Sequence, residues 1–130
     1  MMPWTSDELH AVGTAEELDL AVARADGTLR RPVTIWVVRH EQDLYIRSWR
    51  GRTSGWYRGV QQHGEGHVHA GGVEKDVLLV AAGDAVNDAV DAAYQAKYQR
   101  YLDTYVPPML SSQARETTLR LVPREAHGEE

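Results

Sequence analysis

The chain has 130 residues, of which 42% are hydrophobic and 25% are charged, as is typical of a globular domain. It has no cysteine, which excludes disulfides, thiol catalysis and cysteine-bound metal clusters. Residues 1–12 show no basic region followed by an apolar run, and no apolar stretch reaches about 18 residues. We therefore expect one cytoplasmic domain over residues 1–130, without a signal peptide or membrane span and with a frayed tail at 124–130.

The net charge of −5 is unevenly distributed along the chain. From Arg24 to Arg58, the arginine-rich segment, there are eight arginines, no lysine and three acidic residues, together with three of the four tryptophans. Arginine binds phosphate or carboxylate through two parallel hydrogen bonds, and aromatic side chains stack on flat rings. The segment therefore predicts a site for an anionic ligand with a flat ring. The acidic total argues against general nucleic-acid binding, so we do not expect a nucleic-acid partner.

In chain order, the first signals are two capping boxes, in which Thr5 and Thr14 each precede a glutamate by three residues. This pattern predicts two short helical turns. The other elements expected in the first half are a strand over 18–23, a tight turn at Asp26-Gly27, a strand over 33–40, a strand over 44–49, a loop over 50–55 and a short helix over 56–62.

The second half begins with two strands and contains the longest predicted helix. The expected elements are strands over 66–70 and 76–82 around the turn Gly71-Gly72, a helix over 85–101 capped by Asp84 and stopped by Pro107-Pro108, and a closing strand over 117–122. This order predicts the α+β class. We expect a small antiparallel barrel of about six strands, with one long and one or two short helices packed outside.

The motif that carries most chemistry is residues 47–55, Arg-Ser-Trp-Arg-Gly-Arg-Thr-Ser-Gly. Glycines permit tight turns with exposed N–H groups, hydroxyls add donors, and arginines grip oxyanions, so the segment can bind a phosphate. Trp49, Trp56 or Tyr57 can cover a flat ring. The alternative is a solvated basic loop whose arginines pair with acidic residues or with a partner subunit. No P-loop or dinucleotide fingerprint accompanies the motif.

Two histidines, His67 and His69, share one face of a predicted strand, a spacing compatible with metal binding. Glu65 or Asp76 could supply a third ligand. His-x-His is common on exposed strand faces, however, so we predict a surface or dimer-interface strand and no metal site. The sequence also lacks a recognisable Ser/His/Asp set, which leaves hydrolase chemistry without support.

Four tyrosines recur at helical spacing, and they are Tyr94, Tyr98, Tyr101 and Tyr105. Steps of four, three and four place them on one helical face, which predicts a packing stripe against the barrel or a dimer contact. A ligand-lining role for one of them is the alternative.

Several motifs together resemble an uncharacterised bacterial domain family over about residues 18–123. They are Arg24-Ala-Asp-Gly-Thr-Leu-Arg-x-Pro32, Ile35-Trp-Val-Val-Arg39, Tyr45-Ile-Arg-Ser-Trp-Arg-Gly51, Trp56-Tyr-Arg-Gly59, Ala70-Gly-Gly-Val-Glu-Lys-Asp-Val77 and Asp91-Ala-Ala-Tyr-x-x-Lys-Tyr98. More distantly, the layout is similar to split β-barrel proteins that bind flavin mononucleotide or the deazaflavin coenzyme F-420. That resemblance implies a split barrel, a homodimer and a cofactor phosphate near residues 47–52.

Applied to this chain, the resemblance implies a flavin- or deazaflavin-dependent oxidoreductase that transfers hydride to a small organic acceptor. The residues expected to hold the phosphate are Arg47, Ser48, Arg50, Gly51, Arg52 and Ser54, with Arg30 and Arg31 reaching it from the turn before Pro32. Trp49 and Trp56 would flank the ring, and Tyr57 is the candidate proton donor. The alternative is a non-enzymatic barrel whose arginine and aromatic face binds a carboxylated metabolite or nucleic acid.

Overall fold

The computed structural model describes residues 3–124 of the chain, so residues 125–130 of the predicted tail lie outside the described residues. Within 3–124 the fold is α+β, with five α-helices and seven strands in one antiparallel sheet. The strands are β1 (Leu18–Val22), β2 (Val33–Ile35), β3 (Val38–His40), β4 (Asp43–Ile46), β5 (Glu65–Ala70), β6 (Val73–Ala81) and β7 (Leu119–Pro123). The helices are α1 (Ser6–Thr14), α2 (Gly55–Gln62), α3 (Asn87–Lys97), α4 (Val106–Met109) and α5 (Ser112–Arg115), with 3-10 turns at Gly51–Thr53, Asp84–Val86 and Gln99–Tyr101.

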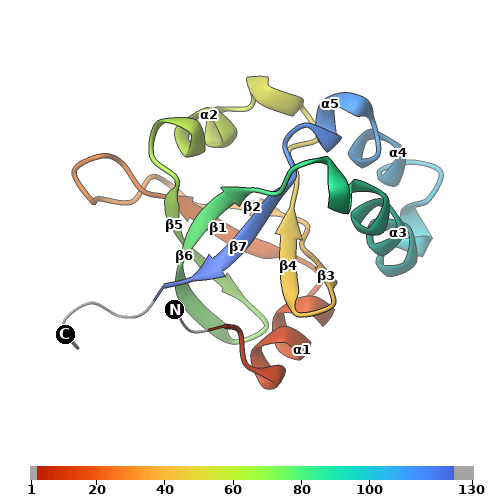
Figure 1. Ribbon diagram of the computed structural model, residues 1–130, viewed down its shortest axis with the longest axis horizontal. Coiled ribbons are helices and arrows are strands. Elements are labelled where there is room, and N and C mark those ends of the chain that lie inside the picture. Colours follow the sequence, from red (N-terminus) through yellow and green to blue (C-terminus); the bar gives the residue numbers. More distant parts are fainter. Residues whose placement is uncertain (1–2, 125–130) are drawn as a thin grey trace.

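The sheet curls into a split barrel because its two edge strands follow each other in the chain. The strand order is β2-β1-β5-β6-β7-β4-β3, so β2 and β3 occupy opposite edges. Two residues, Trp36 and Val37, connect them. Ile35 and Val38 therefore lie at most about 11 Å apart, the reach of three extended residues. Figure 1 shows the strongly curved sheet that results.

This closure corrects the strand predicted over residues 33–40, which is two strands. Val37 is fully buried and packs in the barrel core, whereas Trp36 packs with residues of the outer cluster. The change of partner strand at this point breaks the ladder of hydrogen bonds.

The predicted hairpin before this strand is confirmed: β1 pairs with β2, and Asp26 Oδ1 accepts a hydrogen bond from the backbone N–H of Thr28. The strand predicted over 44–49 is shorter and ends at Ile46.

The barrel core is built from alternate positions of the strands, closed by two helices. Leu18, Leu20 and Val22, at alternate positions of β1, are almost fully buried in this core, and Ala21 on the other face of the strand is buried as well. Leu9 of α1 and Val60 of α2 join the same cluster. Figure 1 shows α1 below the curled sheet and α2 above it.

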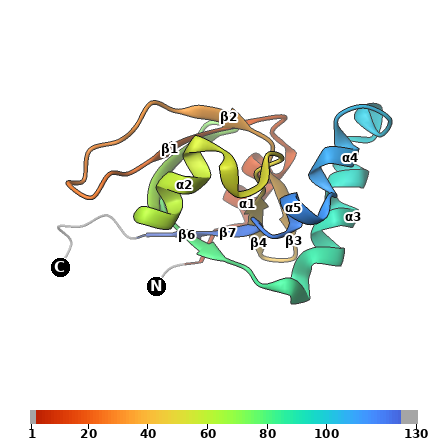
Figure 2. The ribbon, with the colours of Figure 1, turned by 90° about the horizontal axis from the view of Figure 1, so that it is seen from above.

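A second cluster lies outside the barrel and fixes the helices that border the site. Val38 of β3 and Tyr45 of β4 pack against Val90 and Tyr94 of α3 and against α4. Figure 2 shows α3 and α4 together at one end of the molecule, away from α2. The strands β3 and β4 are thus covered on both faces. Leu44 and Tyr45 are neighbours in β4, so their side chains point to opposite faces of the sheet, and both are buried.

The first capping box is confirmed and the second prediction is wrong. Glu8 N–H donates to Thr5 Oγ1 at 3.1 Å, and Thr5 N–H donates to Glu8 Oε1 at 2.9 Å. Thr14 is instead the last residue of α1, and its hydroxyl donates to the carbonyl of His10 at 2.7 Å. Because the Thr14 hydroxyl donates within α1, its side chain does not cap the start of a second helix.

The long helix predicted over 85–101 is also shorter in the structure. It begins at Asn87 without a side-chain cap from Asp84 and ends at Lys97. Pro107 and Pro108 do not stop it but lie in the first turn of α4, where a missing N–H costs nothing. Of the four tyrosines only Tyr94 therefore lies within α3, Tyr98 is the residue that caps its end, and Tyr101 and Tyr105 lie beyond it.

Candidate ligand-binding site

A pocket of about 880 Å³ opens between α2 and the segment that carries α4. One wall is β2 with the Trp36 crossover, and another is the loop that leaves β4. The remaining walls come from the first turn of α2 and from residues around α4. Its lining comprises Glu16, Glu17, Val33, Thr34, Ile35, Trp36, Arg47, Ser48, Trp49, Arg50, Ser54, Gly55, Trp56, Tyr101, Tyr105, Pro108 and Met109. The volume falls in the range of ordinary small-molecule and cofactor sites.

Six of the predicted site residues line this pocket, and they are Arg47, Ser48, Trp49, Arg50, Ser54 and Trp56. They come together because β4 ends at Ile46 and the next eight residues turn back to start α2 at Gly55. Gly51 has a backbone φ of 70°, in the left-handed region that glycine adopts without strain, and its N–H donates to the carbonyl of Ser48. It therefore shapes the turn and does not line the pocket.

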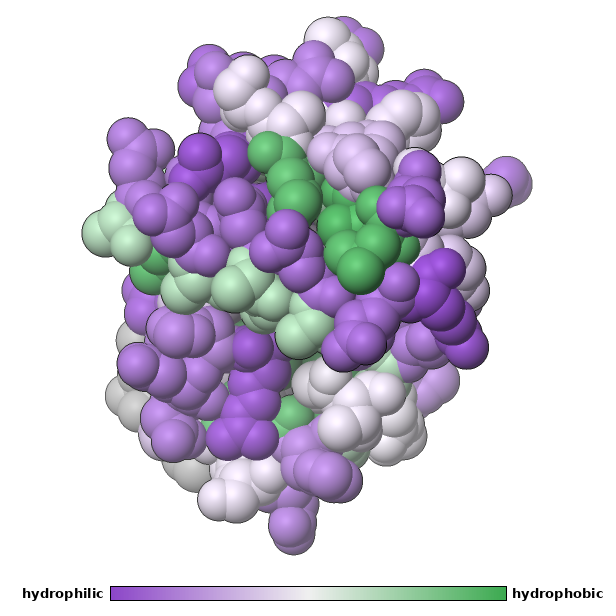
Figure 3. Space-filling view, turned by 90° about the vertical axis from the view of Figure 1, so that its right-hand side faces the viewer, coloured by the Kyte–Doolittle hydropathy of each residue, from purple (hydrophilic) through white to green (hydrophobic). Residues whose placement is uncertain are grey.

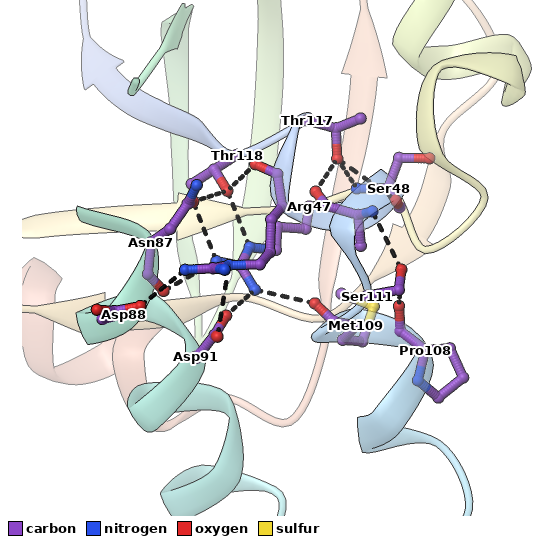
Figure 4. A network of polar contacts seen from close by, with 12 residues as sticks. Arg47, Ser48, Asn87, Asp88, Asp91, Pro108, Met109, Ser111, Thr117 and Thr118 are labelled. Carbon is purple, nitrogen blue, oxygen red and sulfur yellow. Dashed lines mark hydrogen bonds and ion pairs between the residues drawn. The ribbon is translucent and has the colours of Figure 1, made fainter. Parts of the chain in front are cut away.

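Arg47 forms part of the pocket wall, but its guanidinium is held by the protein itself. Nε donates to Thr118 Oγ1, and Nη1 donates to Asp91 Oδ1 at 2.6 Å and to the carbonyl of Met109 at 2.9 Å. Nη2 donates to the carbonyl and the Oδ1 of Asn87. Figure 4 shows the guanidinium surrounded by these groups from α3, α4 and the start of β7.

All five guanidinium N–H groups thus have acceptors, and the residue is 1% exposed. This arrangement corrects the role predicted for Arg47, because no donor remains to hold a phosphate. Arg47 instead fixes α3 and α4 to the end of β4, and so positions the loop that follows it.

Three residues of the pocket lining, Arg50, Ser48 and Ser54, carry polar groups suited to an anion. Within residues 3–124 the Arg50 guanidinium makes no hydrogen bond or ion pair, and it lies 5.1 Å from the centre of the Trp49 ring. Ser48 Oγ and Ser54 Oγ are 2.9 Å apart, and Ser54 Oγ also accepts from the N–H of Tyr57 as the cap of α2. One of the two serine hydroxyl hydrogens bonds the other serine, which leaves one to donate into the pocket.

Aromatic rings make up the flat part of the wall. Trp36 stacks on Tyr98 with ring centres 3.8 Å apart and planes 5° apart, and it lies 5.6 Å from the Tyr101 ring. Tyr98 is itself 1% exposed, so it holds the indole of Trp36 from the protein side. Trp49 and Tyr105, by contrast, are 54% and 62% exposed. The pocket lining therefore combines the Trp36 ring, which is stacked on the protein, with the exposed rings of Trp49 and Tyr105, and it also includes Trp56 and Tyr101.

The pocket lining also includes two acidic residues, Glu16 and Glu17. Glu16 Oε2 is 2.9 Å from Arg100 Nη2, an exposed ion pair. A ligand that fills the pocket therefore meets acidic groups as well as Arg50. The arginine-rich segment alone does not predict these acidic residues.

The remaining predicted residues lie outside the pocket lining. Arg30 packs over Gly59 of α2 and donates to Gln62 Oε1 at 3.3 Å. Arg52 Nε lies 3.5 Å from Glu116 Oε1, and Arg31 is exposed. Tyr57 belongs to the barrel core, with its ring 6.1 Å from that of Trp56. None of these four reaches the ligand space in this conformation.

His67 pairs with carboxylates across the β5–β6 ladder. Its Nδ1 lies 2.9 Å from Asp76 Oδ1 and its Nε2 lies 3.1 Å from Glu74 Oε1. Hydrogen bonding to Asp76, and secondarily to Glu74, raises the pKa of His67 against the opposing effect of burial. The part of the chain that the structure describes contains no cluster of three or more metal-binding side chains.

Sequence reasoning missed Trp36, both glutamates and the residues of β2 and α4. Trp36 was assigned to the interior of a strand, and only the closure between β2 and β3 places it at the pocket. The sequence predicts a packing stripe that includes Tyr101 and Tyr105, with ligand lining by one of the tyrosines as the alternative. That alternative agrees with their position at the pocket.

Figure 3 shows the face that carries α3 and α4, where hydrophobic residues gather in the upper part among polar ones.

A family model described as "Uncharacterized protein conserved in bacteria (DUF2255)" matches residues 8–121. The chain belongs to this bacterial family. The resemblance inferred from the sequence motifs is thereby confirmed. No curated protein matches this chain.

Solved structures similar to this DUF2255 protein share its split-barrel fold. An F420 reductase superposes with a TM-score of 0.58 at 16% identity, covering 90% of this chain and 93% of that one. A pyridoxamine 5'-phosphate oxidase homologue from Listeria innocua gives 0.63 at 13% identity, covering 90% of each chain. A FAD-binding protein from Mesorhizobium loti gives 0.57 at 14% identity, covering 95% and 93%. At these identities the likeness establishes the fold.

Within residues 3–124 no helix is long and apolar enough to cross a membrane.

Proposed function

We propose that this DUF2255 protein binds a flavin-type cofactor, flavin mononucleotide or a deazaflavin, in the pocket between α2 and α4. The observation that carries the proposal is the combination, in one pocket, of the rigid Trp36 ring with the polar end formed by Arg50, Ser48 and Ser54. An apolar ring system with a charged phosphate tail needs both parts. The split-barrel structures named for F420 reduction and FAD binding support the same class of ligand.

The donor set fits such a cofactor at both ends. Arg50 has free guanidinium donors for an oxyanion, and a serine hydroxyl adds a further hydrogen bond. The backbone at Gly55 and Trp56 begins α2, where N–H groups point outward and favour negative charge. The ring then lies along Trp36, with Trp49 or Trp56 on its other side.

When bound, a flavin-type ring supplies hydride transfer, and the residues supply binding and orientation. Trp36 would fix the plane of the cofactor ring, because Tyr98 stacks on the other face of the Trp36 indole and holds it in place. Arg47 keeps the wall in place without contacting the phosphate. Tyr101 and Tyr105 line the same space, so we propose one of them, in place of Tyr57, as the hydroxyl closest to a reacting substrate.

We also propose that the protein is a homodimer whose partner subunit covers the open side of the pocket. Trp49 and Tyr105 are more than half exposed at its rim, and large exposed aromatic side chains are typical of contact surfaces. Light scattering coupled to size-exclusion chromatography tests this. A monomeric mass at micromolar concentration contradicts it.

A second candidate function is non-enzymatic binding of an aromatic carboxylate. The hydrogen bonds of Arg47 favour this function, because all donors of its guanidinium are bonded within the protein. Arg50 is then the arginine of the pocket lining that is free to bind an anion. One bidentate arginine matches a carboxylate well.

Titration separates these functions. Flavin mononucleotide, a deazaflavin and an aromatic carboxylate such as indole-3-acetate are each added to the purified protein, and tryptophan fluorescence and cofactor absorbance are recorded. We expect saturable quenching with a flavin or deazaflavin. Saturation with the carboxylate alone supports the binding module, and no saturation with any of the three contradicts both functions.

A further inference from the structure

The acidic residues of the pocket lining lie beside its aromatic wall. The carbonyl oxygen of Glu16 is 2.8 Å from Tyr98 Oη, and the Tyr98 ring stacks on Trp36. The Glu16 carboxylate pairs with Arg100, whose guanidinium lies 5.1 Å from the centre of the Tyr101 ring. Glu16, Trp36 and Tyr101 all line the pocket. A ligand in contact with these rings therefore lies close to an acidic part of the wall.

Glu17, the neighbour of Glu16 in the lining, has no partner of its own. Its side chain is exposed, and within residues 3–124 its carboxylate makes no hydrogen bond or ion pair. The cations near Glu16, which are Arg100 and Lys97, do not line the pocket, and Lys97 Nζ donates to the carbonyl of Val37 at 2.6 Å. The Glu17 carboxylate is therefore available to a positive charge that enters the pocket.

The balance of charge in the lining leads to the same residue. The charged side chains of the lining are Glu16, Glu17, Arg47 and Arg50. Arg47 is ion-paired with an aspartate of α3, and Glu16 is ion-paired with Arg100. In the proposed function, Arg50 binds the cofactor phosphate. Once the cofactor is bound, Glu17 is the charge of the lining that is left uncompensated, so the remaining space favours a cation.

We propose that Glu17 selects a small organic cation as the substrate that binds beside the cofactor, an inference that rests on the proposed function. The pocket volume of about 880 Å³ is near the upper end of the range for small-molecule sites, so it has room for a second small ligand. A protonated amine of that ligand meets the Glu17 carboxylate. The ring faces of Tyr101 and Tyr105 attract the same charge, as the position of Arg100 over Tyr101 illustrates.

The experiment compares tryptamine with tryptophol, which carries a hydroxyl in place of the ammonium group on the same indole. Each is titrated into isotope-labelled protein saturated with flavin mononucleotide, and NMR follows the indole N–H signals of the four tryptophans. We expect tryptamine to bind about threefold to thirtyfold more tightly, from one exposed ion pair and a cation–π contact. Equal affinities overturn the proposal. Displacement of the mononucleotide by tryptamine also overturns it, because substrate and cofactor must bind together.

Three variants assign the preference to a residue. Glu17→Gln should make the affinities for tryptamine and tryptophol nearly equal and leave the affinity for flavin mononucleotide unchanged. Asp103→Asn removes one exposed negative charge outside the pocket lining and should keep the preference. Arg100→Gln releases the Glu16 carboxylate from its ion pair and should increase the preference. A preference that survives Glu17→Gln, or that falls in Arg100→Gln, contradicts the role of the carboxylates.

A failure of the cofactor proposal has a different signature. A protein that does not bind flavin mononucleotide contradicts the proposed function, and the two indoles are then compared without the cofactor. The readout is the change that Glu17→Gln makes in the ratio of the two affinities, because Arg50 acts equally on the wild type and the variant. A lower preference for tryptamine in Glu17→Gln supports selection of a cation by Glu17, and an unchanged ratio overturns it.

Discussion

Arg47 Nη1 lies 2.6 Å from Asp91 Oδ1, in a pair whose arginine side chain is fully buried and whose aspartate side chain is 23% exposed. The contact joins the residue that follows β4 to the middle of α3. It explains why this arginine, which lies within the predicted phosphate-binding motif, supports the architecture instead. The same guanidinium also holds the carbonyl of Met109 in α4, so the two helices bordering the pocket share one anchor.

The first prediction follows from this pair. Arg47→Ala should lower the free energy of unfolding by about 3–5 kcal/mol, because it leaves a partly buried carboxylate and several acceptors without their donors. Urea denaturation followed by circular dichroism measures the change. The matched control is Arg31→Ala, an exposed residue of the same segment, which should change stability by less than about 0.5 kcal/mol. Similar values for the two variants contradict the anchoring role.

The second prediction concerns pH and His67. Because Asp76 and Glu74 raise its pKa in the folded protein, protonated His67 stabilises the fold fully below its unfolded pKa of about 6.5. This contribution is lost as pH rises through the raised folded pKa. The stability difference between the wild type and His67→Gln should therefore be largest below about pH 6.5 and should shrink as the pH rises through the raised folded pKa.

Urea denaturation at several pH values measures this difference, and NMR titration of the imidazole gives the folded pKa directly. His69 is the control, because it is exposed on the same strand and no partner for it lies within residues 3–124. A folded His67 pKa at or below the unperturbed value of about 6.5 contradicts the arrangement.

The third prediction distinguishes the two tryptophans at the pocket. Trp36→Leu should weaken cofactor binding and also destabilise the fold by roughly 1–3 kcal/mol, because it removes the stack on Tyr98. Trp49→Leu should leave stability nearly unchanged, because that side chain is 54% exposed. Isothermal titration and thermal unfolding measure both quantities. Binding that depends on Trp49 and not on Trp36 would place the ring at the rim instead of along the wall.

Much of the fold follows from local sequence signals. The capping box at Thr5, the alternation in β1 and the Asp26-Gly27 turn each act over a few residues, and the structure contains all three. The interval 33–40 could not be divided in this way, because its residues favour a strand throughout. The break at Trp36 arises when the two edges of a seven-stranded sheet meet, which is a long-range event.

The candidate site was predictable to a similar degree. The sequence indicated the loop after β4, and that loop does line the pocket. It could not show that Arg47 is occupied, since its acceptors lie 40 to 71 residues further along the chain. Nor could it show that Glu16 and Glu17 line the same pocket, because only the folded barrel brings them and Trp36 to one cavity. Charge counts along a chain do not reveal which charges are already paired.

The most direct test of the central claim compares flavin mononucleotide with riboflavin, which has the same ring but no phosphate. Wild-type protein should bind the mononucleotide more tightly, and Arg50→Ala should lose about 1.5–3 kcal/mol of that binding, roughly tenfold to a hundredfold, with riboflavin affinity unchanged. Arg58→Ala, an exposed arginine of α2 outside the pocket lining, should leave both affinities unchanged. Contradiction would come from a protein that binds neither compound, or from an Arg50→Ala variant that keeps the full preference for the phosphate.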